Sequence, residues 1–118
     1  MRDVLVLACA SIVVLATAAK ADFQKLETQA DFVSAVAGKT LKRPMVELNV
    51  TPAGGISGKG AVWPVSGKWT WKDGYFCRDL VWGGDDLGHN CQEVSLNGGK
   101  IRFTSDKGTG QSADFTLR

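Results

Sequence analysis

The sequence predicts an all-β domain with one short N-terminal helix, folded as a small antiparallel up-and-down β-barrel or meander of 7–8 strands. From residue 40 onward, apolar and polar residues alternate with the period of two that half-buried strands show. Turn residues return every 8 to 12 positions, as expected for short strands joined by tight turns. A barrel is favoured because closure removes bare strand edges, and a two-sheet sandwich is the alternative.

The single helix is expected at the start of this domain. Thr28 and Asp31 resemble a capping box in which Asp replaces the usual Glu or Gln. Phe32 and Val36 then lie four residues apart on one helix face, and Gly38 is well placed to end the helix.

The strands follow from the alternation and from the turns between them. Asp73-Gly74 and Asn97-Gly98-Gly99 are hairpin turns, because these residues tolerate positive φ. Residues 83–88 (GGDDLG) are expected to form a longer loop. Glycines inside strands suit the bends of a small barrel, and they are Gly58, Gly60 and Gly67. The expected strands span residues 46–50, 56–61, 65–72, 75–82, 89–96, 100–105 and 113–117.

Residues 1–21 predict a cleavable export signal. Arg2 precedes an apolar run over residues 4–15, about 12 residues long and well short of the roughly 20 that span a bilayer. Two A-x-A sites follow, and we expect cleavage after Ala21; lipidation of Cys9 is the alternative. Residues 22–118 then form one periplasmic or secreted domain, expected to be a monomer with no membrane span.

Charge and cysteine usage narrow the class of protein further. The chain has 14 basic and 12 acidic residues, and removal of the signal leaves a net charge of about +1, which argues against a nucleic-acid partner. The mature domain keeps two cysteines, Cys77 and Cys91, whose spacing fits neither a C-x-x-C nor a zinc pattern. In an exported domain they predict a disulfide, which contributes about 3 kcal/mol to the free energy of unfolding.

The predicted disulfide also sets the register of one hairpin. If Cys77 faces Cys91, Arg78 lies opposite Asn90, Asp79 opposite His89, and Tyr75 opposite Glu93. Asp79 and His89 are therefore weak catalytic candidates for a hydrolase, with Ser66, Ser95 or Ser105 as the nucleophile. No G-x-S-x-G motif surrounds these serines, and the alternative is a structural cross-strand pair.

Aromatic residues of the same region suggest a binding mouth. Trp69, Trp71, Phe103 and Phe115 fit the core of a barrel filled by its own side chains. Trp63, beside Pro64, and Trp82, at a loop edge, are harder to bury, and aromatic rings give large contact areas in binding sites. The predicted ligand-binding residues are Trp63, Tyr75, Arg78, Trp82, Asp85, Asp86 and His89.

No metal and no cofactor are expected. Asp85-Asp86 lies in a glycine-rich segment, but it lacks the spaced oxygen ligands of a calcium loop. Residues 54–60 (GGISGKG) match neither G-x-G-x-x-G nor G-x-x-x-x-G-K-[ST], and no amphipathic helix follows them to bind a phosphate.

Most of the mature chain resembles a family of small exported alphaproteobacterial proteins. The resemblance rests on residues 67–78 (GKWTWKDGYFCR), 82–88 (WGGDDLG), 91–94 (CQEV) and 103–110 (FTSDKGTG). Members often carry the label dihydrodipicolinate reductase, which implies an NAD(P)H-dependent enzyme with a Rossmann domain. The chain has one histidine, no dinucleotide motif and no alternating βα pattern, so no catalytic residue or cofactor transfers.

These observations favour a non-enzymatic binding module whose partner is a small ligand or an envelope protein. Two alternatives stay open. One is an enzyme, either a hydrolase using Asp79 and His89 or the reductase of the family label. The other is a structural envelope protein without a pocket.

Overall fold

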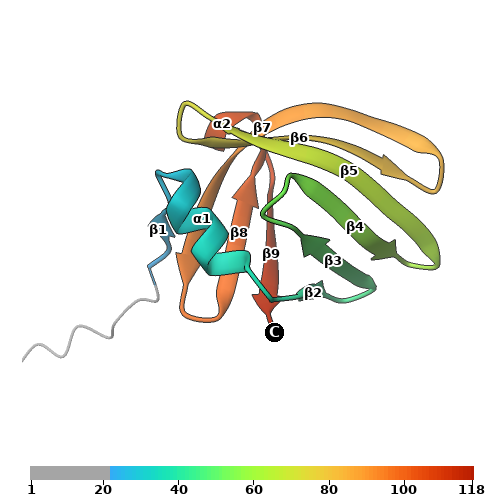
Figure 1. Ribbon diagram of the computed structural model, residues 1–118, viewed down its shortest axis with the longest axis horizontal. Coiled ribbons are helices and arrows are strands. Elements are labelled where there is room, and N and C mark those ends of the chain that lie inside the picture. The colour runs from blue at the N-terminus through green and yellow to red at the C-terminus, as the bar shows by residue number, and fades with distance from the viewer. Residues whose placement is uncertain (1–21) are drawn as a thin grey trace, which may run out of the picture.

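The structure is a computed structural model that describes residues 22–118; the expected signal segment and Cys9 lie outside the described residues. It contains short strands, one helix of two turns and one short helical turn (Figure 1). The elements in chain order are β1 (Gln24–Lys25), α1 (Gln29–Val36), β2 (Leu41–Arg43), β3 (Val46–Val50), β4 (Gly55–Gly60), β5 (Trp63–Lys72), β6 (Tyr75–Trp82), β7 (Asp85–Asn97), β8 (Lys100–Thr104), α2 (Ser105–Gly108) and β9 (Ser112–Leu117).

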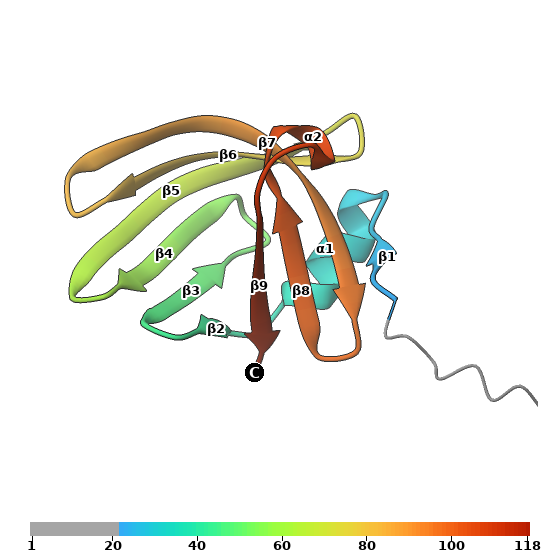
Figure 2. The same cartoon turned by 180° about the vertical axis from the view of Figure 1, so that it is seen from behind.

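Eight strands, β2 to β9, form a closed antiparallel barrel in which each strand pairs with the next along the chain. β9 lies between β2 and β8 and closes the barrel (Figure 2). The β2–β9 pairing joins Leu41 to Leu117 and Lys42 to Thr116. This confirms the predicted up-and-down barrel, and β1 adds a short edge strand beside β7.

Glycines allow neighbouring strands to approach each other closely in the barrel wall. A Cβ atom on Gly67 would lie 2.1 Å from the carbonyl oxygen of Asp79 in β6. A Cβ atom on Gly58 would lie 2.0 Å from the carbonyl oxygen of Glu47 in β3. Any side chain at either position would therefore force the strands apart, which explains glycines in strands that otherwise follow the alternating pattern.

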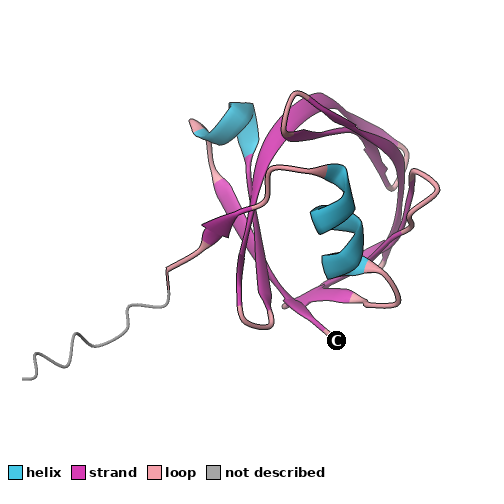
Figure 3. Ribbon diagram, turned by 60° about the vertical axis from the view of Figure 1, so that its left-hand side comes forward, coloured by secondary structure: helices cyan, strands magenta, loops and turns pink. Residues whose placement is uncertain are grey.

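Helix α1 covers one end of the barrel (Figure 3). Its N-cap is Thr28, whose side-chain oxygen accepts a hydrogen bond from the backbone N–H of Asp31 at 3.1 Å. The predicted apolar face points inward, because Phe32 and Val36 are fully buried. Phe32 packs against the rings of four core aromatic residues, Trp69, Trp71, Phe76 and Phe103. This helix therefore closes one end of the barrel with an aromatic cluster.

The predicted hairpin around the disulfide is confirmed. Cys77 and Cys91 form a disulfide between β6 and β7, Arg78 lies opposite Asn90, and Asp79 lies opposite His89. The β6–β7 ladder ends at the Phe76–Gln92 pair, one pair short of the expected Tyr75–Glu93 pair, and Glu93 pairs with Thr104 in β8.

Two local features differ from the sequence-based expectation. The predicted loop over residues 83–88 is a two-residue turn, Gly83-Gly84, because Asp85 already pairs with Trp82. A register shift follows where Val81 pairs with Asp86 and Leu80 with Gly88, so that Leu87 is the additional residue of a β-bulge. The sequence also does not predict the short turn α2; its central residues Asp106 and Lys107 have positive φ.

Neither helix in residues 22–118 has the length and apolar character needed to cross a membrane.

Candidate functional site

A cavity of about 400 Å³ lies inside the barrel. Its apolar wall includes Phe76 and Phe103, whose rings lie 5.0 and 6.3 Å from that of Phe32 in the α1 plug. These contacts place the apolar wall toward the end of the barrel that α1 closes. The other apolar residues that line the cavity are Leu41, Leu48, Val50, Ile56, Leu80, Ala113 and Phe115.

The polar lining of the cavity comes from several strands and from α2. Arg43 is the last residue of β2, Ser105 begins α2, and Ser112 begins β9. Gln92 lies opposite Phe76 in the β6–β7 ladder and donates a hydrogen bond to Ser105, so polar groups also lie beside the apolar wall. The full polar lining is Arg43, Arg78, Gln92, Ser105, Gln111 and Ser112.

Arg78 is the most unusual of these polar residues. It projects from the middle of β6 on the same face as Phe76 and Leu80, because side chains alternate along a strand. One guanidinium nitrogen, Nη1, donates a hydrogen bond to the carbonyl oxygen of Gly88 at 2.9 Å. The Nε atom is buried and has no hydrogen-bond partner among the described residues. Burial lowers the pKa of Arg78, and the neighbouring Asp79 opposes this effect.

The charged residues that line the cavity are basic. Among the described residues that line it, two are arginines and none is Asp or Glu. The second arginine, Arg43, lies with its guanidinium carbon 5.6 Å from the centre of the Phe115 ring. An apolar cavity with two cationic groups and no carboxylate favours ligands that combine apolar surface with negative charge.

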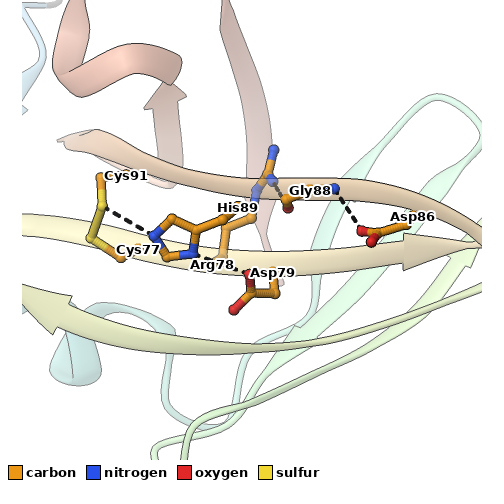
Figure 4. Close-up of polar contacts among 7 residues, drawn as sticks. All are labelled: Cys77, Arg78, Asp79, Asp86, Gly88, His89 and Cys91. Atoms are coloured by element: carbon orange, nitrogen blue, oxygen red, sulfur yellow. Dashed lines mark hydrogen bonds and ion pairs between the residues drawn. A yellow bond between two sulfur atoms is a disulfide. The ribbon is translucent and has the colours of Figure 1, made fainter.

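Asp79 and His89 lie on the outer face of the same hairpin, beside the disulfide (Figure 4). The His89 Nδ1 atom is 3.1 Å from an oxygen of Asp79, and the two side chains are 58% and 67% exposed. The other ring nitrogen, Nε2, lies 3.7 Å from the sulfur of Cys91, a position that a triad would give to a nucleophile. The pair thus has the contact a hydrolase would need, but it lies in the open and its free nitrogen faces a disulfide sulfur.

The three serines considered as nucleophiles lie in different surroundings. Ser95 is buried under β1, and Ser105 accepts a hydrogen bond from Gln92 in the cavity. Ser66 borders a shallow outer depression that Asp79 and His89 also line. None of the hydrogen bonds of His89 within residues 22–118 goes to a serine.

The other residues predicted to bind a ligand lie outside the barrel cavity. Trp63, Trp82 and Asp85 border a small hollow between the β4–β5 and β6–β7 hairpin tips, where Trp82 donates a hydrogen bond to the carbonyl oxygen of Gly60. Asp86 and His89 border the outer depression. Tyr75 lies by the β5–β6 turn, with the ammonium groups of Lys25 and Lys107 at 5.0 and 5.6 Å from its ring centre. Of the seven predicted residues, Arg78 alone lines the cavity.

The described chain offers one group of metal-ligand side chains, Cys77, His89 and Cys91, whose donor atoms lie within 4.8 Å of one another. Two of these donors are the sulfurs of the closed disulfide, and a metal requires thiolates. The arrangement therefore does not suit a metal while the disulfide is intact. Asp85 and Asp86 belong to no such group in residues 22–118, and one oxygen of Asp86 accepts the backbone N–H of Gly88.

The fold and the cavity define the class of protein as a closed eight-stranded antiparallel barrel with an internal cavity lined by apolar residues and two arginines. Comparisons with protein-family models, with curated proteins and with solved structures find no significant match.

Proposed function

We propose that the protein is a non-enzymatic binding module that holds one small, mainly apolar ligand inside the barrel. The observation that carries this proposal is the 400 Å³ cavity, whose size lies within the roughly 300–1,000 Å³ of small-molecule sites. Eight-stranded barrels are just wide enough to be filled by side chains or to hold one small ligand. Here the lining includes a small residue, Ala113, at a position where a larger one would fill the interior.

The proposed location is outside the cytoplasm, in the periplasm or the surrounding medium. The disulfide between Cys77 and Cys91 supports it, because such bonds persist in oxidising compartments. A carrier in this location would protect an apolar molecule from water between two sites. The exposed position of Asp79 and His89 makes the hydrolase a weaker interpretation, and the cavity argues against a purely structural role.

The proposal is tested with an apolar dye that fluoresces on leaving water, such as N-phenyl-1-naphthylamine. The chain is purified after expression from its full coding sequence and titrated with the dye. Three proteins are compared: the wild type, Ala113→Phe and Thr116→Phe. Ala113 lines the cavity, whereas Thr116 lies on the same strand, β9, one position beyond the inward-facing Phe115.

We expect wild type and Thr116→Phe to enhance the dye fluorescence in a saturable way and Ala113→Phe to lose the saturable part. The phenyl ring of Ala113→Phe would occupy the space that the dye needs. Equal binding by all three proteins would place the dye on the outer surface and would refute the cavity as the binding site. Circular dichroism of each variant checks that the barrel is folded.

A further inference from the structure

The two arginines of the cavity suggest the chemistry of its ligand. A guanidinium is always charged near neutral pH, and burying a charge without a partner costs free energy. Arg78, which is partly buried, and the exposed Arg43 nevertheless line a cavity in which no described residue supplies a carboxylate. We propose, building on the binding function proposed above, that the ligand is an apolar molecule that ends in a carboxylate, and that Arg78 binds this group.

The geometry of Arg78 supports this assignment. Its Nη1–H group bonds to the carbonyl oxygen of Gly88, which fixes the orientation of the guanidinium plane. Its Nε–H group is covered by protein atoms and has no hydrogen-bond partner within residues 22–118. Its Nη2 atom also makes no hydrogen bond within these residues but is not covered in this way, so a ligand carboxylate in the cavity can reach it. Arg78 is thus held in place by Gly88 and keeps a charged donor group for an anion.

A second arginine of the same barrel, Arg102, has a carboxylate partner within the chain. Arg102 pairs through both Nε and Nη2 with the two oxygens of Asp114, at 2.7 and 3.0 Å, on neighbouring strands. Residues 22–118 supply no such carboxylate to Arg78, because its neighbour Asp79 projects from the opposite face of β6 toward His89. A ligand carboxylate at Nη2 would give Arg78 the charged partner that Asp114 gives Arg102.

The rest of the cavity sets the orientation of such a ligand. Arg43 is the last residue of β2, and no ion pair engages it within residues 22–118, so its charge also favours an anion in the cavity. The wall formed by Phe76, Phe103 and neighbouring apolar residues extends toward the α1 plug. The apolar part of the ligand would therefore point toward α1, with its carboxylate at Arg78.

The experiment compares three ten-carbon probes that differ in their head groups: decanoate, 1-decanol and decylamine. Each probe competes with the bound dye in wild type, in Arg78→Gln and in the control Arg102→Gln. Arg102 is an arginine on the outer face of the barrel, so its substitution removes a charge without touching the cavity. We expect wild type and Arg102→Gln to bind decanoate at least about tenfold more tightly than decanol, as charge-assisted hydrogen bonds provide.

In Arg78→Gln the preference for decanoate over decanol should fall to about twofold or less, while decanol binding stays within about twofold of wild type. Equal affinity of wild type for decanoate and decanol would overturn the assignment of the carboxylate and leave the cavity proposal standing. Failure of all three probes to displace the dye would instead count against the proposed binding function itself. An unchanged preference in Arg78→Gln would also refute the role of Arg78.

A second measurement reports on the ligand itself. The carboxyl carbon of ¹³C-labelled decanoate reports its own protonation by NMR as the pH is changed. Burial raises the pKa of a carboxyl and contact with a guanidinium lowers it, so the bound carboxyl should titrate at lower pH in wild type than in Arg78→Gln. Titration at the same pH in both proteins would show that the carboxyl lies away from Arg78 and would refute the proposal.

Discussion

Truncation of Phe32 tests whether α1 is part of the barrel core. The Phe32 side chain is fully buried, and its ring lies 5.0 to 6.3 Å, centre to centre, from four other aromatic rings. A buried Phe→Ala change costs about 3–5 kcal/mol of the free energy of unfolding, and aromatic pairs add about 0.5–1.5 kcal/mol each. Because these contributions overlap, we expect Phe32→Ala to cost about 4–5 kcal/mol.

The size of this loss matters because the free energy of unfolding of a domain of this length is small. Folded domains have a free energy of unfolding of about 5–15 kcal/mol, so Phe32→Ala would remove about a quarter of it or more. The assay is urea unfolding followed by tryptophan fluorescence, which is sensitive here because Trp69 and Trp71 contact Phe32. Ser34→Ala, at an exposed position of the same helix, serves as the control and should change the free energy by no more than about 0.5 kcal/mol.

A loss below about 2 kcal/mol for Phe32→Ala, with an unchanged denaturant slope, would refute the reasoning. It would mean that the barrel core is stable without the plug and that α1 is only docked on it. A reduced denaturant slope would instead indicate that the helix no longer unfolds together with the barrel.

Three further predictions concern single bonds and single backbone positions. Replacing Cys77 and Cys91 with serine should lower the free energy of unfolding by about 3 kcal/mol, as measured in urea, and a reductant should then have no further effect. The hydrogen bonds from Arg102 hold the pKa of Asp114 below its ordinary value, so the pair stabilises the fold at neutral pH and this contribution is lost as the pH falls below about 4. Wild type should therefore exceed Asp114→Asn in stability at pH 7, with the difference vanishing in acid; a difference that persists at pH 2 would contradict this. Met45 is exposed and has a φ of 68°, so Met45→Asn should raise the melting temperature slightly, by an amount equivalent to about 0.5 kcal/mol, and a lower melting temperature would contradict this.

Much of the fold could be predicted because the local signals agree with one another. Alternation along each strand identified the inner face, and the Asp73-Gly74 turn, with φ of 52° and 86°, has the backbone that its sequence suggests. The disulfide then fixed the β6–β7 register from Cys77 and Cys91 alone. The predicted start of β7 at His89 was wrong, because residues 83–88 have the composition of a loop. Pairing with β6 overrides that composition, and the bulge at Leu87 absorbs the additional residue.

The candidate site was less predictable from the sequence. Arg78 was singled out together with His89, but their positions in the register place them on opposite faces of the hairpin, so they do not share one site. Arg43 was missed because β2 has three residues, too few to show an alternating pattern. Gln92 and Gln111 were also missed, since their place in the cavity depends on how distant strands curve around it. The signal in the sequence that points to the cavity is Arg78, a charged residue that shares the inward face of β6 with Phe76 and Leu80.

The seam between β2 and β9 has a consequence for the order of folding. Every other pairing in the barrel joins strands that are neighbours in the chain, so those hairpins can form early with little loss of chain entropy. The seam joins residues that are far apart in the chain, through the residue pairs Leu41–Leu117 and Lys42–Thr116. Reciprocal backbone hydrogen bonds between Thr40 and Arg118 lie next to them. We therefore expect closure of the ring to be the last and slowest step of folding. We also expect the folded wall to open first at this seam, so that its amide protons exchange with solvent before those of β5 and β6.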